Sequence, residues 1–285
     1  MSVHYDLHSH SLASDGSLSP AELIMAAHAG GVDVLALTDH DTTDGLTEAA
    51  QCARQLGLQL VPGVEISVSW QSQTIHVLGL GIDPACKALQ TGLSGLREFR
   101  NWRAEEIGRR LARAGIPGCY EGARRLARGR VVGRTHFAHH LVAEGHARSA
   151  RHVFKRFLVN NKPGYVTGDW ANLEDALSWI DRAGGLAVVA HPARYRMTVS
   201  KLRRFLNEFR ECGGAGMEVI SGSHTRDNIT TMAALCRNQD MLASCGSDYH
   251  GPENPWIKLG QLPPLPADCP PVWESDRWRA TESTS

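Results

Sequence analysis

Short apolar segments that read as β-strands recur along this 285-residue chain, and nearly every one delivers a histidine or a carboxylate at or just beyond its end. The segments are residues 3–7, 32–37, 58–64, 74–80, 186–190, 217–220 and 242–245. Strands that alternate with helix-like stretches favour an α/β fold with a largely parallel sheet. About seven strands predict a distorted (β/α)7 barrel, and no GxGxxG motif follows the first strand to favour an open doubly wound sheet.

The possible metal ligands gather where such a barrel would present them together. His8 and His10 follow the first segment, and period-two alternation places both side chains on one side of an extended stretch. His76 lies inside the fourth segment, and only segment 217–220 contributes no residue to the set. Active sites of α/β barrels are built at the carboxyl ends of the strands. The set comprises His8, His10, Asp15, His40, Glu65, His76, His191, Asp248 and His250.

These candidate ligands are too numerous for a single ion. A tetrahedral zinc site takes about three or four protein ligands, so this set predicts two or three divalent cations. The donors are nitrogen and oxygen without a thiolate, which favours Mn²⁺, Zn²⁺ or Fe²⁺ over soft metals or magnesium.

Charge divides the chain into three parts although its formal net charge is zero. Residues 1–96 and 163–285 carry an excess of acidic side chains, whereas residues 97–162 hold 16 basic and 5 acidic ones. Helical patterns at 93–114, 120–127 and 137–144 fill this middle part. We therefore expect a discontinuous barrel (1–96 and 163–285) with a basic, mainly helical insertion (97–162) over the active site, and a loosely packed tail from residue 263 onward. Such an insertion suits an anionic partner, or it is simply a solvated Arg-rich surface.

The motifs together resemble those of the polymerase and histidinol phosphatase (PHP) family. The matching pieces are Asp6-Leu7-His8-Ser9-His10 with Asp15, Thr38-Asp39-His40-Asp41, Gly63-Val64-Glu65, Ile75-His76, Ala190-His191-Pro192 and Gly246-Ser247-Asp248-Tyr249-His250. The resemblance implies a distorted seven-stranded barrel and a three-metal centre, often with manganese. Within the family, the long insert with Gly133-Arg134-Thr135-His136 is most similar to the branch that dephosphorylates 3′,5′-nucleoside bisphosphates, related members of which degrade short RNA from the 5′ end. Thr135 stands where that branch is expected to have proline.

The resemblance also implies roles for the ligands. One ion would be held by His8, His10, Glu65 and Asp248, a second by Glu65, His76 and His191, and a third by Asp15, His40 and His250. Clustered divalent ions lower the pKa of bound water and clamp phosphoryl oxygens, so a bridging hydroxide would attack phosphorus without a protein nucleophile. Asp248 and His191 are the candidate catalytic residues, with Asp248 orienting or deprotonating the water.

Cationic and polar contacts to the substrate are expected from the insertion and the neighbouring loops. Arg134 is the first choice, because a guanidinium group binds phosphate through two hydrogen bonds. The remaining candidates are His136, Lys162, Arg194, Ser67 and His224.

Four functions are open at this stage. The leading one is a metal-dependent phosphatase that removes the 3′-phosphate of a small nucleotide with two phosphates, such as adenosine 3′,5′-bisphosphate. A 5′-to-3′ exoribonuclease acting on short RNA at the same site is the nearest alternative. A histidinol-phosphatase-like enzyme fits less well, because its cationic substrate suits a basic insertion poorly. The fourth is a non-catalytic nucleic-acid-binding module, which would not need so complete a ligand set.

The sequence also bears on where the protein works. There is no visible signal peptide and no apolar run of about 18 residues, so no contact with a membrane is expected. Seven scattered cysteines without a CxxC pair predict free thiols and favour a reducing cytoplasm. The oligomeric state is left open.

Overall fold

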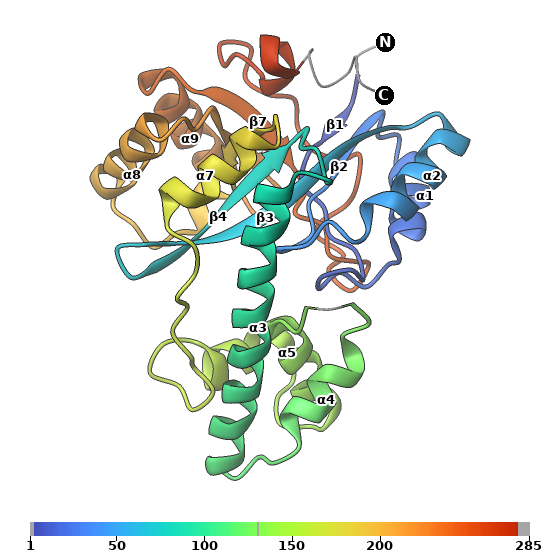
Figure 1. Cartoon of the computed structure of the whole chain (residues 1–285), viewed down its shortest axis with the longest axis vertical. Coiled ribbons are helices and arrows are strands. Elements are labelled where there is room, and N and C mark those ends of the chain that lie inside the picture. The colour runs from blue at the N-terminus through green and yellow to red at the C-terminus, as the bar shows by residue number, and fades with distance from the viewer. Residues whose placement is uncertain (1–2, 130, 279–285) are drawn as a thin grey trace.

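A single seven-stranded sheet forms the centre of the molecule in the computed structural model, which describes residues 3–129 and 131–278. Its strands lie in sequence order, β1 to β7. Figure 1 labels β1, β2, β3, β4 and β7 of this sheet. Their bounds are β1 Tyr5–Asp6, β2 Val34–Leu37, β3 Gln59–Trp70, β4 Gln73–Leu80, β5 Leu186–Val189, β6 Gly216–Ser221 and β7 Leu242–Gly246. All neighbouring pairs are parallel except those of β4, which runs antiparallel to both β3 and β5.

The first and last strands meet, so the sheet nearly closes on itself. The amide of Leu7 donates to the carbonyl of Cys245 at 2.9 Å, and Ser9 forms a parallel bridge with Tyr249. Buried side chains such as Leu7, Leu78 and Val188 fill the interior. The predicted distorted seven-stranded barrel is therefore confirmed.

Helices pack around the barrel and complete the alternation of strands and helices. Those between consecutive strands are α1 Pro20–Ala29, α2 Leu46–Leu56, α7 Leu173–Arg182, α8 Val199–Glu211 and α9 Arg226–Asn238. The analysis of the sequence did not predict α8 and α9, although Thr198 and Thr225 cap their first turns with hydroxyl groups. A 3₁₀ turn at Pro192–Arg194 follows β5.

The third and fourth strands differ from the prediction. A strand ending just before Glu65 was expected, but β3 continues to Trp70 and turns back as a hairpin into β4. Glu65 consequently lies inside β3, and His76 lies opposite Ser67 on the adjacent strand. This reversal brings His76 to the same rim as Glu65 although β4 runs in the opposite direction.

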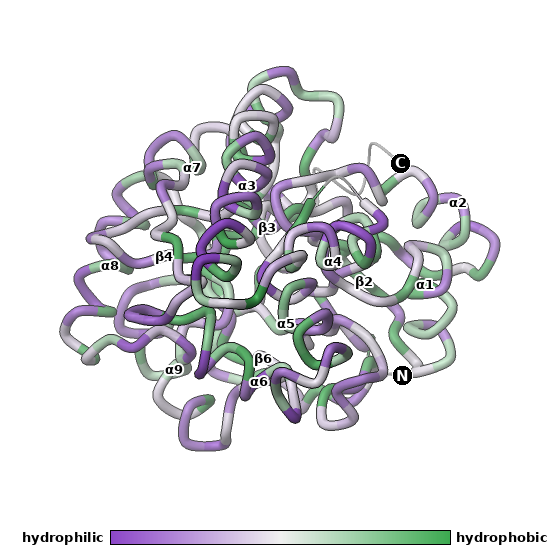
Figure 2. The backbone as a smooth tube through the Cα atoms, turned by 90° about the horizontal axis from the view of Figure 1, so that it is seen from below, coloured by the Kyte–Doolittle hydropathy of each residue, from purple (hydrophilic) through white to green (hydrophobic). Residues whose placement is uncertain are grey.

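The segment between β4 and β5 has a hydrophobic core of its own. It contains α3 Lys87–Arg113, α4 Cys119–Leu126, α5 Arg134–Ala143, α6 Ala150–Val153 and a π-helical turn at Phe154–Leu158. Ile107, Phe137 and Leu158 are buried together there, apart from the barrel core. Figure 2 shows α3, α4 and α5 in front of the strands. The second core supports our proposed division at 97–162, although α3 crosses residue 97 without a break.

The tail is packed more closely than predicted. From residue 263 to 278 it returns to the barrel, where Val272 and Trp278 are fully buried. The ring of Trp273 stacks on Tyr5 with centroids 3.8 Å apart, and Pro271 forms a bridge with Ala243. The expectation of a loose extension is wrong for these residues, because their apolar side chains cover the barrel end.

Two other expectations concern the chain as a whole. All seven cysteines are free thiols. Within residues 3–129 and 131–278, no helix has the length and apolarity to span a bilayer.

Candidate metal centre

Four ligand-type side chains converge at the rim where the chain leaves β1 and β7. The Nε2 atoms of His8 and His10 lie 3.1 Å apart. The Oε2 atom of Glu65 lies 3.5 and 3.3 Å from them, and the Oδ1 atom of Asp248 lies 3.4 and 3.3 Å from them. All four residues are buried.

A second group shares Glu65. Its other oxygen, Oε1, is 2.8 Å from Nδ1 of His76 and 3.1 Å from Nε2 of His191. His191 follows β5 in the left-handed backbone region, with φ of 32°. A non-glycine residue there is strained, and such strain is found mainly at functional sites.

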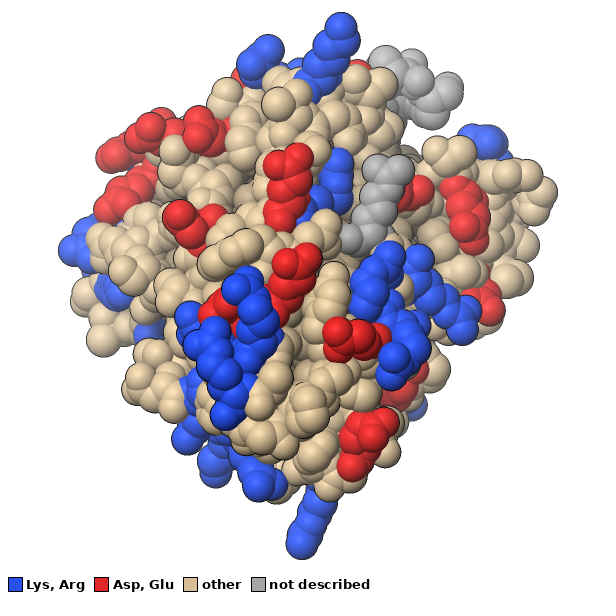
Figure 3. Space-filling view, turned by 60° about the horizontal axis from the view of Figure 1, so that its bottom comes forward, with Lys and Arg blue, Asp and Glu red and all other residues tan. Residues whose placement is uncertain are grey.

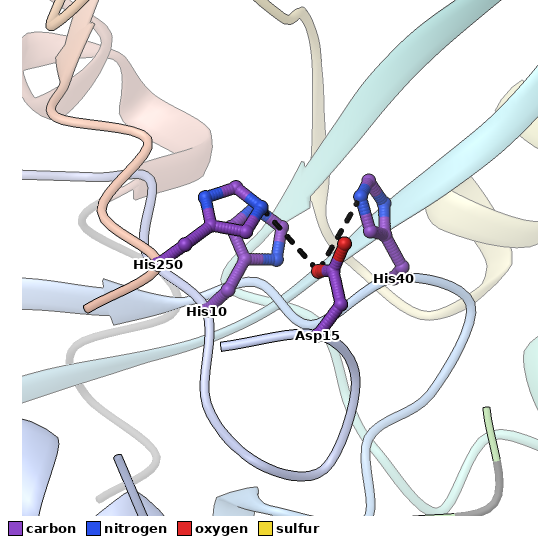
Figure 4. Close-up of side chains that lie close together, drawn as sticks. All are labelled: His10, Asp15, His40 and His250. Atoms are coloured by element: carbon purple, nitrogen blue, oxygen red, sulfur yellow. Dashed lines mark ion pairs between the residues drawn. The ribbon is translucent and has the colours of Figure 1, made fainter. Parts of the chain in front are cut away.

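A third group lies on the side of the rim nearest the helical segment. The Oδ1 atom of Asp15 is 3.3 Å from Nε2 of His250 and 3.8 Å from Nε2 of His40. The ring of His10 stacks on that of His250 with centroids 4.2 Å apart, so this group adjoins the first one. Figure 4 shows His40 and His250 directed at the carboxylate from either side.

These geometries fit divalent cations. In a tetrahedron with metal–ligand bonds of 2.0–2.1 Å, neighbouring donor atoms lie about 3.3–3.4 Å apart, which is the spacing in the first group. Oε2 of Glu65 lies 2.8 Å from Nδ1 of His40, and Oδ1 of Asp15 lies 3.3 Å from Nε2 of His250. Neither contact has the geometry of a hydrogen bond, and among the described residues both buried oxygens are without a hydrogen-bond partner. A buried carboxylate oxygen without a partner is costly unless a cation or proton satisfies it.

The pKa values of the imidazoles in the cluster shift in two directions. Burial opposes the charged form, but neighbouring carboxylates outweigh it and raise the pKa of His8, His40 and His250, the last to about 10, so these three carry protons that a bound cation would displace. Burial, reinforced by His250, lowers the pKa of His10 to about 3. Burial also lowers the pKa of His76 to about 4, against the attraction of Glu65. Both imidazoles are therefore neutral at pH 7, as metal ligation requires. Burial raises the pKa of Asp248, but His8 and His250 outweigh it and hold that pKa well below its usual range.

Glu218 is a functional candidate that the sequence analysis missed. Its Oε1 atom accepts a hydrogen bond from Nδ1 of His8 at 2.8 Å, and Oε2 accepts one from the backbone amide of His191. Metal-binding histidines commonly donate their second nitrogen to such a carboxylate, which fixes the tautomer. The signal was an acidic residue inside the apolar segment 217–220, the segment from which no contribution was expected.

A buried ion pair ties α3 to the loop that carries His40. Arg100 donates to the carboxylate of Asp41 and to the hydroxyl of Ser67, while Asp41 also accepts from the amide of Ser67 at 2.8 Å. The hydroxyl of Ser67 therefore already accepts a bond from Arg100. This network went unnoticed in the sequence because its members are far apart along the chain.

Two predicted residues, Arg134 and His136, lie at the start of α5, where the intervening Thr135 contacts Asp15. The hydroxyl of Thr135 donates to Oδ2 of Asp15 at 2.9 Å. The ring of His136 accepts from the amide of Gly133 at 3.0 Å, so it stabilises the helix start. The guanidinium of Arg134 lies over the ring of Phe154, 5.5 Å from its centroid.

The remaining candidates lie in different surroundings. Arg194 forms an ion pair with Asp248. His224 places Nδ1 3.1 Å from the carbonyl of Val219, and its buried Nε2 has no partner among the described residues. Lys162 is exposed, and among the described residues no hydrogen bond or ion pair joins its side chain to the cluster.

The fold and this cluster define a metal-dependent phosphoesterase architecture. The chain belongs to the PHP family: the family model described as "PHP domain" matches residues 6–166.

Within that family its relatives are close over nearly the whole chain. It is 47% identical to the 3′,5′-nucleoside bisphosphate phosphatase of Chromobacterium violaceum over 272 residues, 95% of each chain. It is 44% identical to the 5′-3′ exoribonuclease Rnm of Escherichia coli over 285 residues, which cover 99% of this chain and 96% of that one. A solved structure of an amidohydrolase from C. violaceum, with bound sulfate and no metal, superposes with a TM-score of 0.93 at 46% identity, covering 99% of this chain and 96% of the other.

Proposed function

We propose that this protein is a metal-dependent phosphoric monoester hydrolase that removes the 3′-phosphate of 3′,5′-bisphosphonucleotides, such as adenosine 3′,5′-bisphosphate. The observation that carries the proposal is the position of α5: its start meets Asp15, so Arg134 stands beside the candidate metal centre. One anionic group can then lie at the cluster while a second is held at the helix start. The similarity to the C. violaceum phosphatase supports the same substrate class.

The three groups of side chains are the proposed ligand sets. His8, His10, Glu65 and Asp248 would hold one ion; Glu65, His76 and His191 a second; and Asp15, His40 and His250 a third. Bound divalent cations, for which we propose Mn²⁺, would supply an activated water and neutralise charge on the phosphoryl oxygens.

The chain's own residues orient the reaction. Asp248 and His191 are the proposed catalytic residues. Asp248 lies beside His8 in the first group, and His191 lies beside Glu65, which the first and second groups share. Arg194 holds Asp248 from the open side of the rim and is itself half exposed, so its guanidinium can also meet a phosphoryl oxygen. His191 has a buried Nδ1 without a partner among the described residues, where a proton can be held.

The second phosphate has a cationic surrounding in the helical segment. Arg103 and Arg134 lie close enough for each to affect the other, and burial together with Arg134 lowers the pKa of Arg103 to about 9. Arg103 donates to the carbonyl of Val166, and no carboxylate forms an ion pair with either arginine among the described residues. Arg103 is buried and Arg134 is half-buried, and cations removed from water without a carboxylate partner favour binding of an anion. We propose that Arg134 binds the phosphate that does not react, with His136 supporting the helix start.

A second function, 5′-to-3′ exoribonuclease activity on short RNA, shares this chemistry. In both reactions water adds to phosphorus, the bond between phosphorus and O3′ breaks, and O3′ takes up a proton. In RNA the phosphorus carries the rest of the chain, so the products are a 5′-mononucleotide and a shortened RNA with a new 5′-phosphate. The similarity to the exoribonuclease Rnm supports this alternative. A cytoplasmic location stays a prediction.

Phosphate release from adenosine 3′,5′-bisphosphate tests the proposal directly. Metal-free protein reloaded with Mn²⁺ is compared on this substrate, a 5′-phosphorylated RNA pentamer and histidinol phosphate. We expect AMP and inorganic phosphate from the bisphosphate. Turnover of the pentamer alone would make the protein an exoribonuclease only, and inactivity on all three would overturn the proposal.

Arg134 provides a sharper test of the second phosphate site. Because a charge-assisted hydrogen bond contributes on the order of 1.5–3 kcal/mol, Arg134→Ala should raise KM for the bisphosphate at least about tenfold. Arg203→Ala on α8, which removes an exposed arginine, is the matched control. An unchanged KM in Arg134→Ala would refute the assignment.

A further inference from the structure

The helical segment carries exposed Lys and Arg side chains that the proposed bisphosphate reaction does not use. Figure 3 shows Lys and Arg in clusters on the face turned forward, with acidic side chains between them. Two sets stand out because, among the described residues, none of their members forms an ion pair with a carboxylate. They are the α4 arm, formed by Arg124, Arg125 and Arg128, and the α6 arm, formed by Arg148, Arg151 and Lys155.

The α4 arm leads directly to the candidate metal centre. The turn after α4 touches the loop that carries Asp15: a Cβ atom added to Gly129 would lie only 2.4 Å from the carbonyl oxygen of Ala13. Arg128 immediately precedes this contact. Arg124 bonds the carbonyls of Ala127 and Gly129, which holds the turn in place.

The α6 arm is connected to the centre through α5. Helices α5 and α6 pack together, and Arg134 lies over the ring of Phe154. Lys155 is the next residue, in the π-helical turn Phe154–Leu158. Both arms are thus exposed on the outside but tied to the start of α5, beside the cluster.

We propose that the α4 and α6 arms form a docking surface for the RNA chain downstream of the phosphate that reacts. The inference rests on the proposed function and extends it to polymeric substrates. A mononucleotide bisphosphate ends at the reacting phosphate and does not reach the arms. An RNA continues from that phosphate, so its next phosphates need cations outside the centre. The exposure and the missing carboxylate partners leave Arg125, Arg128, Arg148, Arg151 and Lys155 available for that role, while Arg124 adds its charge and keeps its bonds to the turn.

Equilibrium binding separates this surface from catalysis. Fluorescence anisotropy measures binding of a labelled, 5′-phosphorylated RNA of ten nucleotides to metal-free protein in EDTA, over a range of salt concentrations. The variants are Arg125→Ala/Arg128→Ala and Arg148→Ala/Arg151→Ala/Lys155→Ala; Arg124 is left in place because it holds the turn after α4. The control removes three exposed cations from the barrel side, Arg54→Ala/Arg203→Ala/Lys258→Ala.

We expect each arm variant to raise the Kd for RNA at least about tenfold. Each lost phosphate contact removes about 0.7 from the slope of log K against log salt for a single strand, so the α4 variant should lower its magnitude by about 1.4 and the α6 variant by about 2. With Mn²⁺ restored, kcat and KM for adenosine 3′,5′-bisphosphate should stay at the wild-type values, which also shows that the variants fold.

Several results would decide the matter. Wild-type RNA binding by both arm variants, or an equal loss in the control, would overturn the docking surface. Loss of binding in one arm variant alone supports a surface limited to that arm. If RNA binding depends on the arms but the wild-type protein hydrolyses neither adenosine 3′,5′-bisphosphate nor RNA, the docking surface is supported and the proposed function is refuted.

Discussion

The hydrogen bonds of Glu218 make a quantitative prediction about metal affinity. Its two carboxylate oxygens each face a donor, Nδ1 of His8 and the backbone amide of His191. In Glu218→Gln only one of these positions can be occupied by an accepting oxygen, because the other becomes an NH₂ group facing a donor. The variant must lose one hydrogen bond, and His8 loses the negative charge that favours Nδ1–H and leaves Nε2 free to ligate.

We expect Glu218→Gln to bind Mn²⁺ about 10- to 100-fold more weakly, the usual effect of losing such a partner. This loss corresponds to about 1.4–2.7 kcal/mol of binding free energy. Competition with a chromophoric chelator gives the Mn²⁺ affinity of metal-free protein. Glu211→Gln, on the exposed face of α8, is the matched control.

The activity of the same variant distinguishes metal binding from a direct part in the reaction. At saturating Mn²⁺, Glu218→Gln should recover most of the wild-type kcat, because the residue acts through His8 and does not touch the substrate. An Mn²⁺ affinity equal to that of the wild type would refute the reasoning and leave Glu218 a purely structural residue of the barrel.

Three further perturbations follow from the structure. Arg100→Ala leaves the buried carboxylate of Asp41 uncompensated and should cost about 3–5 kcal/mol of unfolding free energy in urea titrations; a loss below 1 kcal/mol would show that the pair is not structurally important. Mn²⁺ at 100 times its Kd should stabilise the fold by about 2.7 kcal/mol per site, so calorimetry that finds equal Tm values with Mn²⁺ and with EDTA would contradict a metal site. Burial raises the pKa of Asp6 to about 7, so the folded protein takes up a proton that the unfolded chain releases near pH 4. The stability that Asp6 contributes to the metal-free protein is therefore lost as the pH rises from 4 to 7, whereas His10 and His76, whose pKa values are lowered, act in the opposite direction over this range. The difference in unfolding free energy between the wild type and Asp6→Asn in urea titrations isolates this contribution and should shrink from pH 4 to pH 7; a difference that does not change with pH would assign the effect to another group.

The sequence was sufficient for the sheet and for the set of candidate ligands. Most strands are short and apolar and lie close in sequence to a candidate ligand, either within the strand or just after it, so the information is local. The spacing of His8 and His10 and the position of His191 after β5 are visible without knowing how the chain folds.

The end of β3 and the packing of the tail depend on tertiary contacts that cannot be seen in the sequence. Whether β3 ends at Glu65 or continues to Trp70 is decided by its pairing with β4, because alternation alone does not define the end of a strand. The tail was misjudged for the same reason: its polar composition concealed Trp278, which is buried only because the barrel end lies beneath it.

Glu218 and Arg100, which support the cluster, could not be predicted from the sequence. Glu218 lies 210 residues from His8, and Arg100 lies 59 residues from Asp41. The sequence by itself determined which donors could bind cations, because ligand chemistry belongs to the side chain. Only the tertiary structure decided which of them meet, which carboxylate orients His8 and where the helical segment places Arg134, because hydrogen bonds and ion pairs need atoms within a few ångströms and chain folding sets those distances.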